Sequence, residues 1–291
     1  MLPSLKARHQ QFIRERQYLH NVSPATVRWY THAFKWLSMC VSPEDPSQDE
    51  LNAAVCHMRE KGLKATGANA AIRAINAYLH WNSKSTRKCG AGCTHPRVSS
   101  LKEPSIVLPT FSAAQVKLLV TWKPKGFYER RLHLLVLILL DTGCRIGECL
   151  TVHVKDIDFD NLLVTLTGKG HKQRVVPFSF ELRRQVFRFV SEYHKKPDDF
   201  LLSSKFGTKV GRNVALRDVK RLCARLGFKP PARTLHAFRH TFGGNYVRQG
   251  GSVFHLQKAL GHTSLEMSRR YANLMTEDLQ AIHQRVSLLA A

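Results

Sequence analysis

Apolar positions recur with a helical period through residues 1–81. In "SPATVRWYTHAFKWL", Ser23 is suited to cap a helix and Pro24 to occupy its first position. The apolar residues that follow share one helix face: Val27, Tyr30, Phe34 and Leu37. The capping-box pattern "SQDE" at 47–50 and the apolar spacing of 65–81 indicate two more helices. These patterns predict a small helical bundle with basic residues on its outer faces.

The helical pattern is lost over residues 82–109. This segment, "NSKSTRKCGAGCTHPRVSSLKEPSIVLP", is rich in Ser, Gly, Pro and Lys, which is typical of a linker. Cys89, Cys93 and His95 could supply three ligands to zinc, but no fourth ligand is evident nearby. We therefore expect a linker whose thiols hold no metal.

A second folded region begins after the linker. Ser112 and Gln115 form a capping box, and an apolar helix is expected over 127–141. The apolar period then changes to two at 164–167 and 174–178, which predicts a hairpin around the loop "GKGHK". Helical patterns resume near residue 180 and continue to the end of the chain. We expect a mainly α protein with one small antiparallel sheet.

The charge of the chain points to a polyanionic partner. The chain has 45 Lys and Arg residues but only 21 Asp and Glu, which gives a net charge of +24. An imbalance of this size favours nucleic acid over a merely soluble surface, and no basic amphipathic anchor suggests a membrane. The longest apolar run, 132–140, is about half a membrane span, and no signal pattern opens the chain. We expect a soluble, cytoplasmic protein with reduced cysteines.

Two segments of the second region carry candidate phosphate chemistry. In "TGCRIGE", Arg145 and Glu148 stand one helical turn apart, so that the carboxylate can brace a guanidinium that binds phosphate. Taken alone, this is more simply an exposed ion pair. Lys169 lies between two glycines at the hairpin tip, where a solubilising lysine is the simpler interpretation.

The segment "TLHAFRHTF" places His236, Arg239 and His240 on one helix face, with Thr234 as the expected cap. Core histidines are the ordinary interpretation. The His-x3-His spacing suits zinc, but an arginine on the same face and the lack of a glutamate base argue against a metallohydrolase. The acidic run at 156–161 likewise lacks the glycine and the final glutamate of a calcium loop, and it fits a strand and a turn.

In "LGHTSLEMSRRY", Thr263 and Glu266 form a capping box that places His262 just before a helix. Tyr271 then lies about two turns along that helix, directly after a pair of arginines. A half-buried aromatic is the ordinary interpretation of this tyrosine, and a reactive hydroxyl is the other.

In their order along the chain, these residues resemble the signature of the tyrosine recombinase family, which includes the phage integrases, Cre and the Xer recombinases. The resemblance covers both folded regions. The ordered set that carries it is Arg145, Lys169, His236, Arg239, His262 and Tyr271.

The resemblance implies a role for each of these residues. Arg145 and Arg239 would clamp the scissile phosphate, His262 would donate to it, and Glu148 would support the first arginine. Fixed cations of this kind stabilise the charge that gathers on a phosphate in transit.

The proton-transfer roles also follow from the resemblance. Tyr271 would attack the phosphate, Lys169 would protonate the leaving oxygen, and His236 would take part in proton transfer. Tyrosine, with a free pKa of about 10, needs nearby cations and a proton acceptor to react.

The same resemblance implies the organisation of the whole protein. Residues 1–81 would be a helical, SAM-like core-binding domain, and residues 110–291 a catalytic domain with a C-terminal tail helix. A site-specific recombinase of this family acts on double-stranded DNA as a homotetramer on two sites, in the cytoplasm of a bacterial cell, and requires neither metal nor ATP. Basic residues expected on the outer faces of the first domain are candidate DNA contacts, although such faces are ordinarily only solvated: Arg28, Lys35 and Arg73.

Two other functions compete with recombination. A type IB topoisomerase uses similar phosphate chemistry to relax supercoils, and the residue set also suits an inactive DNA-binding accessory factor. The two-domain length and the short tail after Tyr271 favour recombination. The sequence names neither the DNA site nor the outcome among integration, excision, inversion and resolution.

Overall fold

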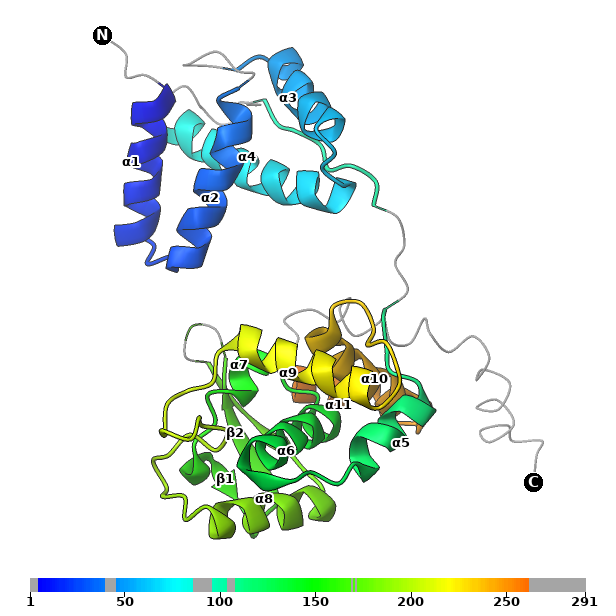
Figure 1. Ribbon diagram of the computed structural model, residues 1–291. Helices are drawn as coiled ribbons and strands as arrows, with labels where there is room; N and C mark the ends of the chain where they lie inside the picture. The colour runs from blue at the N-terminus through cyan, green and yellow to red at the C-terminus, as the bar shows by residue number, and fades with distance from the viewer. Residues whose placement is uncertain are drawn as a thin grey trace, which may run out of the picture. The chain divides into compact units, whose positions relative to one another are not determined.

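The computed structural model describes residues 5–39, 46–85, 96–103, 108–168, 170 and 172–261. The chain divides into two compact units, Met1–Ile106 and Val107–Ala291. The division falls inside the predicted linker (Figure 1).

The first unit is a bundle of helices, as the apolar period predicts. Its helices are α1 (Leu5–Tyr18), α2 (Pro24–Leu37), α3 (Gln48–Glu60) and α4 (Ala65–Ser85). Ser23 caps α2 by accepting a hydrogen bond from the Thr26 amide, and Ser47 and Glu50 form the predicted capping box of α3. The bounds of α4 differ from the expectation, because this helix continues beyond residue 81 to Ser85.

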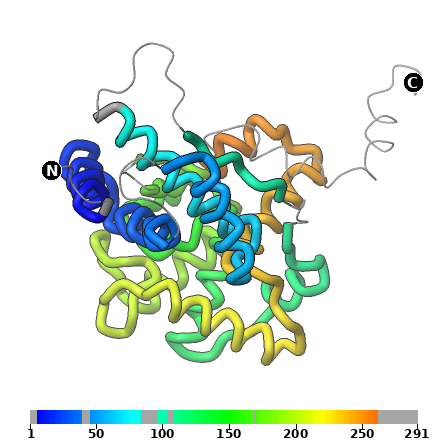
Figure 2. Tube along the Cα trace, turned by 90° about the horizontal axis from the view of Figure 1, so that it is seen from above, coloured from blue at the N-terminus to red at the C-terminus, as the bar shows by residue number. Residues whose placement is uncertain are grey.

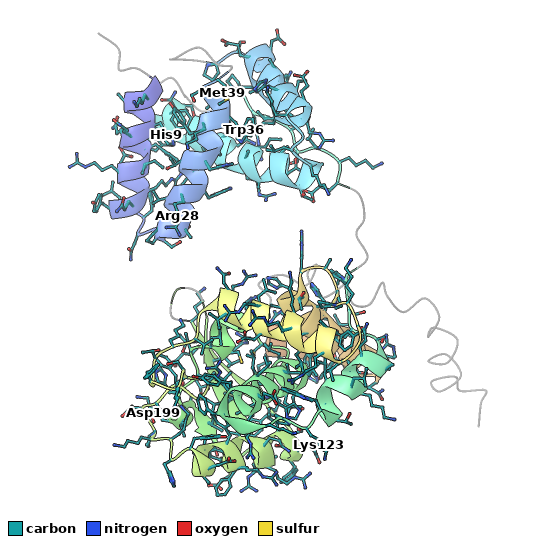
Figure 3. The ribbon with its side chains drawn as sticks, viewed as in Figure 1. His9, Arg28, Trp36, Met39, Lys123 and Asp199 are labelled. Atoms are coloured by element: carbon teal, nitrogen blue, oxygen red, sulfur yellow. The ribbon has the colours of Figure 1, made fainter. Side chains whose placement is uncertain are left out.

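Aromatic side chains fill the centre of this bundle. Phe12 is fully buried and meets Tyr30 edge-on, with ring centroids 4.9 Å apart. The imidazole of His9 stacks on Phe34 at 3.7 Å, and burial lowers the pKa of His9 to about 4. Figure 3 shows this histidine on α1, the helix beside α2. His9 is therefore a neutral core residue at neutral pH.

Part of the predicted linker packs on the first unit. The side-chain amide of Asn76 donates to the Val98 carbonyl at 2.9 Å and accepts from the Val98 amide at 3.0 Å. Asn69 pairs with the backbone of Leu101 in the same way, at 2.9 and 2.8 Å. These asparagines of α4 satisfy backbone groups as a neighbouring strand would. The segment at 96–103 is therefore ordered by α4, and Cys89, Cys93 and His95 lie outside the described residues.

The second unit is mostly helical and carries a small sheet. Its helices are α5 (Ala113–Thr121), α6 (Gly126–Thr142), α7 (Ile146–Cys149), α8 (Phe180–Glu192), α9 (Arg212–Arg225), α10 (Thr234–Arg248) and α11 (Val253–Leu260), with a short 3-10 turn at Val154–Asp156. The strands are β1 (Ile157–Asp158), β2 (Leu163–Thr167) and β3 (Gln173–Pro177). They pair antiparallel in the order β1-β2-β3, and Thr167 lies opposite Gln173 where the predicted hairpin begins to turn.

Helix α6 lies at the centre of this unit and packs against α5, α8, α9 and α10. Helices α10 and α11 are also in contact, and they lie side by side in Figures 1 and 2. The α6 helix ends at Gly143, whose φ of 60° is left-handed. A Cβ at this position would lie 2.3 Å from the ring of Phe242 on α10, so only glycine fits where the end of α6 meets α10.

The start of α10 differs from the prediction. Thr234 is the first helical residue and not the cap, and its hydroxyl donates to the Pro231 carbonyl at 3.0 Å. The N-cap position belongs to Arg233, which adopts a φ of 54°. A left-handed arginine is rare, and a sequence pattern gives no reason to expect it.

The described residues were expected to hold no membrane span and to have reduced cysteines. No helix among them is both long and apolar enough to cross a membrane. Their cysteines carry free thiols, as predicted: Cys56, Cys144, Cys149 and Cys223.

Candidate active site

The predicted pairing of Arg145 with Glu148 is present at the start of α7. Glu148 accepts from the Arg145 amide at 2.8 Å and from its Nη1 at 2.9 Å. The carboxylate is buried, whereas the arginine side chain is 40% exposed. Glu148 therefore holds one side of the Arg145 guanidinium, and solvent or a ligand can reach the rest.

A second arginine, which the sequence patterns did not single out, completes this ion pair. Arg174 of β3 donates from Nη1 and Nη2 to the two oxygens of Glu148, both at 2.8 Å. Burial alone would raise the pKa of Glu148, but the hydrogen bonds from Arg174 and Arg145, together with the charge of Arg174, lower this pKa to about 2. Glu148 is thus an anion at neutral pH, held between two cations.

Helix α10 supplies the other predicted residues of the site. Arg239 is 5% exposed and donates to the Gly143 carbonyl at 3.0 Å and to the Leu260 carbonyl at 2.6 Å. His236 lies one turn earlier on the same helix. Partial burial lowers the pKa of His236, and four positive charges lower it further: Arg212, Arg239, Arg233 and Arg145. His236 is therefore neutral at pH 7, the form that accepts a proton.

The C-terminal end of α11 joins these parts. Its last carbonyl groups are the negative end of the helix, where cations are stabilised. Consecutive carbonyls each accept from a different arginine: Ala259 from Arg174 at 3.0 Å, Leu260 from Arg239 at 2.6 Å, and Gly261 from Arg145 at 3.4 Å. The structure thus brings Arg145, Glu148 and Arg239 together. His236 is close enough for the charges of both arginines to lower its pKa.

The remaining predicted residues, Lys169, His262 and Tyr271, lie outside the described part of the chain. The residues before Lys169 and His262, Gly168 and Gly261, are described and lie at the site. Gly168 closes the hairpin by donating to the Lys172 carbonyl at 2.8 Å, and a Cβ on Gly168 would lie 3.4 Å from Glu148 Oε1.

Three further arginines bear on the site without having been predicted: Arg174, Arg212 and Arg233. All three come from segments whose sequence patterns indicate only a strand, a helix start or a loop. The candidate DNA contacts Arg28, Lys35 and Arg73 are exposed on α2 and α4 of the first unit. Figure 3 shows Arg28 on α2, near the opposite end of the helix from Trp36.

The influence of Arg212 on His236 is testable. Replacing Arg212 by Gln removes a positive charge that lowers the pKa of His236, so this pKa should rise. Histidine-labelled protein titrated by NMR measures the change, with His236→Asn to assign the signal. Arg225→Gln, on the same helix but paired with Glu129, is the control and should leave the pKa unchanged. A His236 pKa that stays constant or falls in Arg212→Gln would contradict the assignment.

The described fold is a mostly helical domain with a small sheet and a cluster of arginines around one buried carboxylate. A family model described as the phage integrase family matches residues 110–278. The chain therefore belongs to the phage integrase family.

Relatives and solved structures agree over most of the chain. Tyrosine recombinase XerA of Thermococcus kodakarensis is 25% identical over 277 residues, 93% of this chain and 92% of the relative. Tyrosine recombinase XerC of Staphylococcus epidermidis is 30% identical over 165 residues, 55% of this chain and 53% of the relative.

Two solved structures share the fold. The Tn1549 transposon integrase in complex with transposon right end DNA has a TM-score of 0.76 at 20% identity, over 98% of this chain and 100% of that chain. The XerH recombinase bound to its palindromic difH substrate in a post-cleavage complex has a TM-score of 0.74 at 18% identity, over 97% of this chain and 84% of that chain.

Proposed function

We propose that this protein is a site-specific DNA recombinase that cuts and rejoins double-stranded DNA through a 3′-phosphotyrosyl intermediate on Tyr271. The observation that carries the proposal is the cluster of arginines held by Glu148 and by the end of α11. Relatives over most of the chain are named tyrosine recombinases, and DNA is bound in the solved structures of similar fold.

The arginine cluster suits a phosphodiester whose charge increases during reaction. The guanidinium of Arg145 is held by Glu148 and by the Gly261 carbonyl, and its side chain is 40% exposed to solvent, so that a ligand can reach it. Arg239 places a second fixed charge beside it. Because these cations are held before substrate arrives, little reorganisation is needed when the transition state forms.

The proposed reaction exchanges one phosphate ester bond for another. The Tyr271 oxygen forms a bond to phosphorus, the bond from phosphorus to the 5′ oxygen breaks, and the 3′ phosphate stays on the tyrosine. His236 accepts the tyrosine proton, and Lys169 donates one to the 5′ oxygen. The phosphodiester energy is kept in the phosphotyrosine, so rejoining is the reverse reaction. This scheme requires neither ATP nor a metal ion.

The assembly that we propose is a homotetramer on two DNA sites in the cytoplasm of the host cell. The net charge of +24 supports a large phosphate contact surface. Residues 1–81, with Arg28, Lys35 and Arg73, would form the core-binding half of a clamp around the duplex, and residues 110–291 the catalytic half. In the tail at 277–291, Leu279, Ile282, Val286 and Leu289 recur at a helical spacing, and we propose that this tail links protomers.

A plasmid assay separates recombination from its alternatives. A supercoiled plasmid carrying two copies of the DNA that flanks this gene should yield circles with exchanged flanks. Relaxed plasmid without recombinant circles would indicate a type IB topoisomerase instead. Protection of the DNA without any covalent complex would indicate an inactive accessory factor. The positions of protection and cleavage also identify the DNA site.

A further inference from the structure

We infer that Arg174 is a positioning residue, which sets the geometry of the arginine cluster for cleavage by holding Glu148 and the end of α11. This inference rests on the proposed function and adds to it a residue outside the set on which the family resemblance depends. The guanidinium of Arg174 contacts two separate parts of the site.

The first part is the Glu148–Arg145 pair. Arg174 grips both carboxylate oxygens of Glu148 at 2.8 Å, and Glu148 Oε1 also holds Arg145 Nη1 at 2.9 Å. A carboxylate that accepts hydrogen bonds on both oxygens from one guanidinium is held in a fixed orientation. The direction in which Glu148 holds Arg145 is therefore fixed by Arg174.

The second part is the end of α11. Arg174 Nε donates to the Ala259 carbonyl at 3.0 Å. Gly261 follows with a φ of 64°, and a Cβ there would lie 3.0 Å from Arg174 Cδ. The arginine thus lies against the turn that ends α11, and His262 is the next residue along the chain.

The contacts of Arg174 are those of a group that anchors its neighbours. Nε, Nη1 and Nη2 all donate to protein acceptors, and the side chain is 16% exposed, against 40% for Arg145. Arg174 also stands on β3, directly after the hairpin that contains Lys169. One half-buried guanidinium therefore connects the hairpin, the start of α7 and the end of α11.

This role requires the fork of a guanidinium and not just a positive charge. Lysine has a single ammonium group on a flexible stem, which cannot hold two carboxylate oxygens and the Ala259 carbonyl in one plane. Arg174→Lys therefore keeps the charge beside Glu148 but loses the fixed direction. A small misplacement of reacting groups slows a reaction by about 10²-fold, which is the loss expected here.

The test compares Arg174→Lys and Arg174→Met with wild type on a nicked duplex that traps the covalent complex. Single-turnover cleavage at saturating DNA should be about 10²-fold slower in both variants. The Kd for the duplex, measured with Tyr271→Phe as the common background, should be unchanged. Arg130→Lys, the same substitution in an exposed ion pair with Glu192, is the control and should cleave at the wild-type rate.

A double-mutant cycle separates positioning from a general loss of structure. If Arg174 acts through Glu148, adding Arg174→Lys to Glu148→Gln should slow cleavage little further. Losses that multiply in the double variant, wild-type cleavage by Arg174→Lys, or a defect confined to the Kd would each overturn the inference. A wild-type protein that forms no covalent complex would instead overturn the proposed function, and Arg174 would then be a structural ion-pair residue.

Discussion

Tyr271→Phe should abolish the covalent protein–DNA complex while folding and DNA binding persist. Phenylalanine keeps the ring and its packing but lacks the oxygen that attacks phosphorus. The measurement is trapping on a nicked suicide duplex, followed by denaturing electrophoresis, together with a binding isotherm on the intact site.

A matched control guards against an unspecific effect of losing a phenol. Tyr128 is 57% exposed on α6, so Tyr128→Phe also removes an accessible hydroxyl. This variant should form the complex like the wild type. Trapping by the Tyr271→Phe protein would mean that the nucleophile is a different residue.

The second large effect is expected at Lys169. When the tyrosine attacks, the 5′ oxygen leaves poorly unless it is protonated. Lys169→Ala should therefore slow cleavage by about 10²-fold or more. A 5′ sulfur leaves readily without a proton, so the same variant should cleave a 5′-phosphorothiolate duplex almost as fast as the wild type. Single-turnover rates on the two substrates measure this rescue.

Other variants make the sulfur experiment specific. Arg145→Ala should stay slow on both substrates, because sulfur does not replace the stabilisation of the phosphate charge. Lys172→Ala, in the same loop, should resemble the wild type on both. If sulfur fails to rescue Lys169→Ala, this lysine is not the general acid, and His171 and Lys172 become the candidates.

Local signals in the sequence predicted most of the helices and the hairpin. The caps at Ser23, Ser47 and Ser112 are short-range interactions between residues that are three positions apart. The Arg145–Glu148 pair was predicted for the same reason, since its partners are one turn apart. A pattern that extends over one turn is visible in the sequence alone.

The rest of the site depends on contacts between distant residues. Arg174 reaches Ala259, and Arg145 reaches Gly261, across long stretches of chain that no periodicity connects. The docking of residues 96–103 on α4 likewise depends on asparagine side chains that replace strand partners. The residues that resemble the family signature were therefore identified from the sequence, but the arrangement that positions them was not.

We propose that Tyr271 carries DNA through a 3′ phosphate, and mapping the covalent complex tests this most directly. The trapped complex is digested with nuclease and trypsin, and the modified peptide is sequenced by mass spectrometry. Trypsin should cut after Arg270 and Arg285, which leaves a peptide whose first residue is the only tyrosine in it, Tyr271. We predict a nucleotide linked through its 3′ phosphate to this tyrosine. A nucleotide on any other residue, or one linked through its 5′ phosphate, would contradict it.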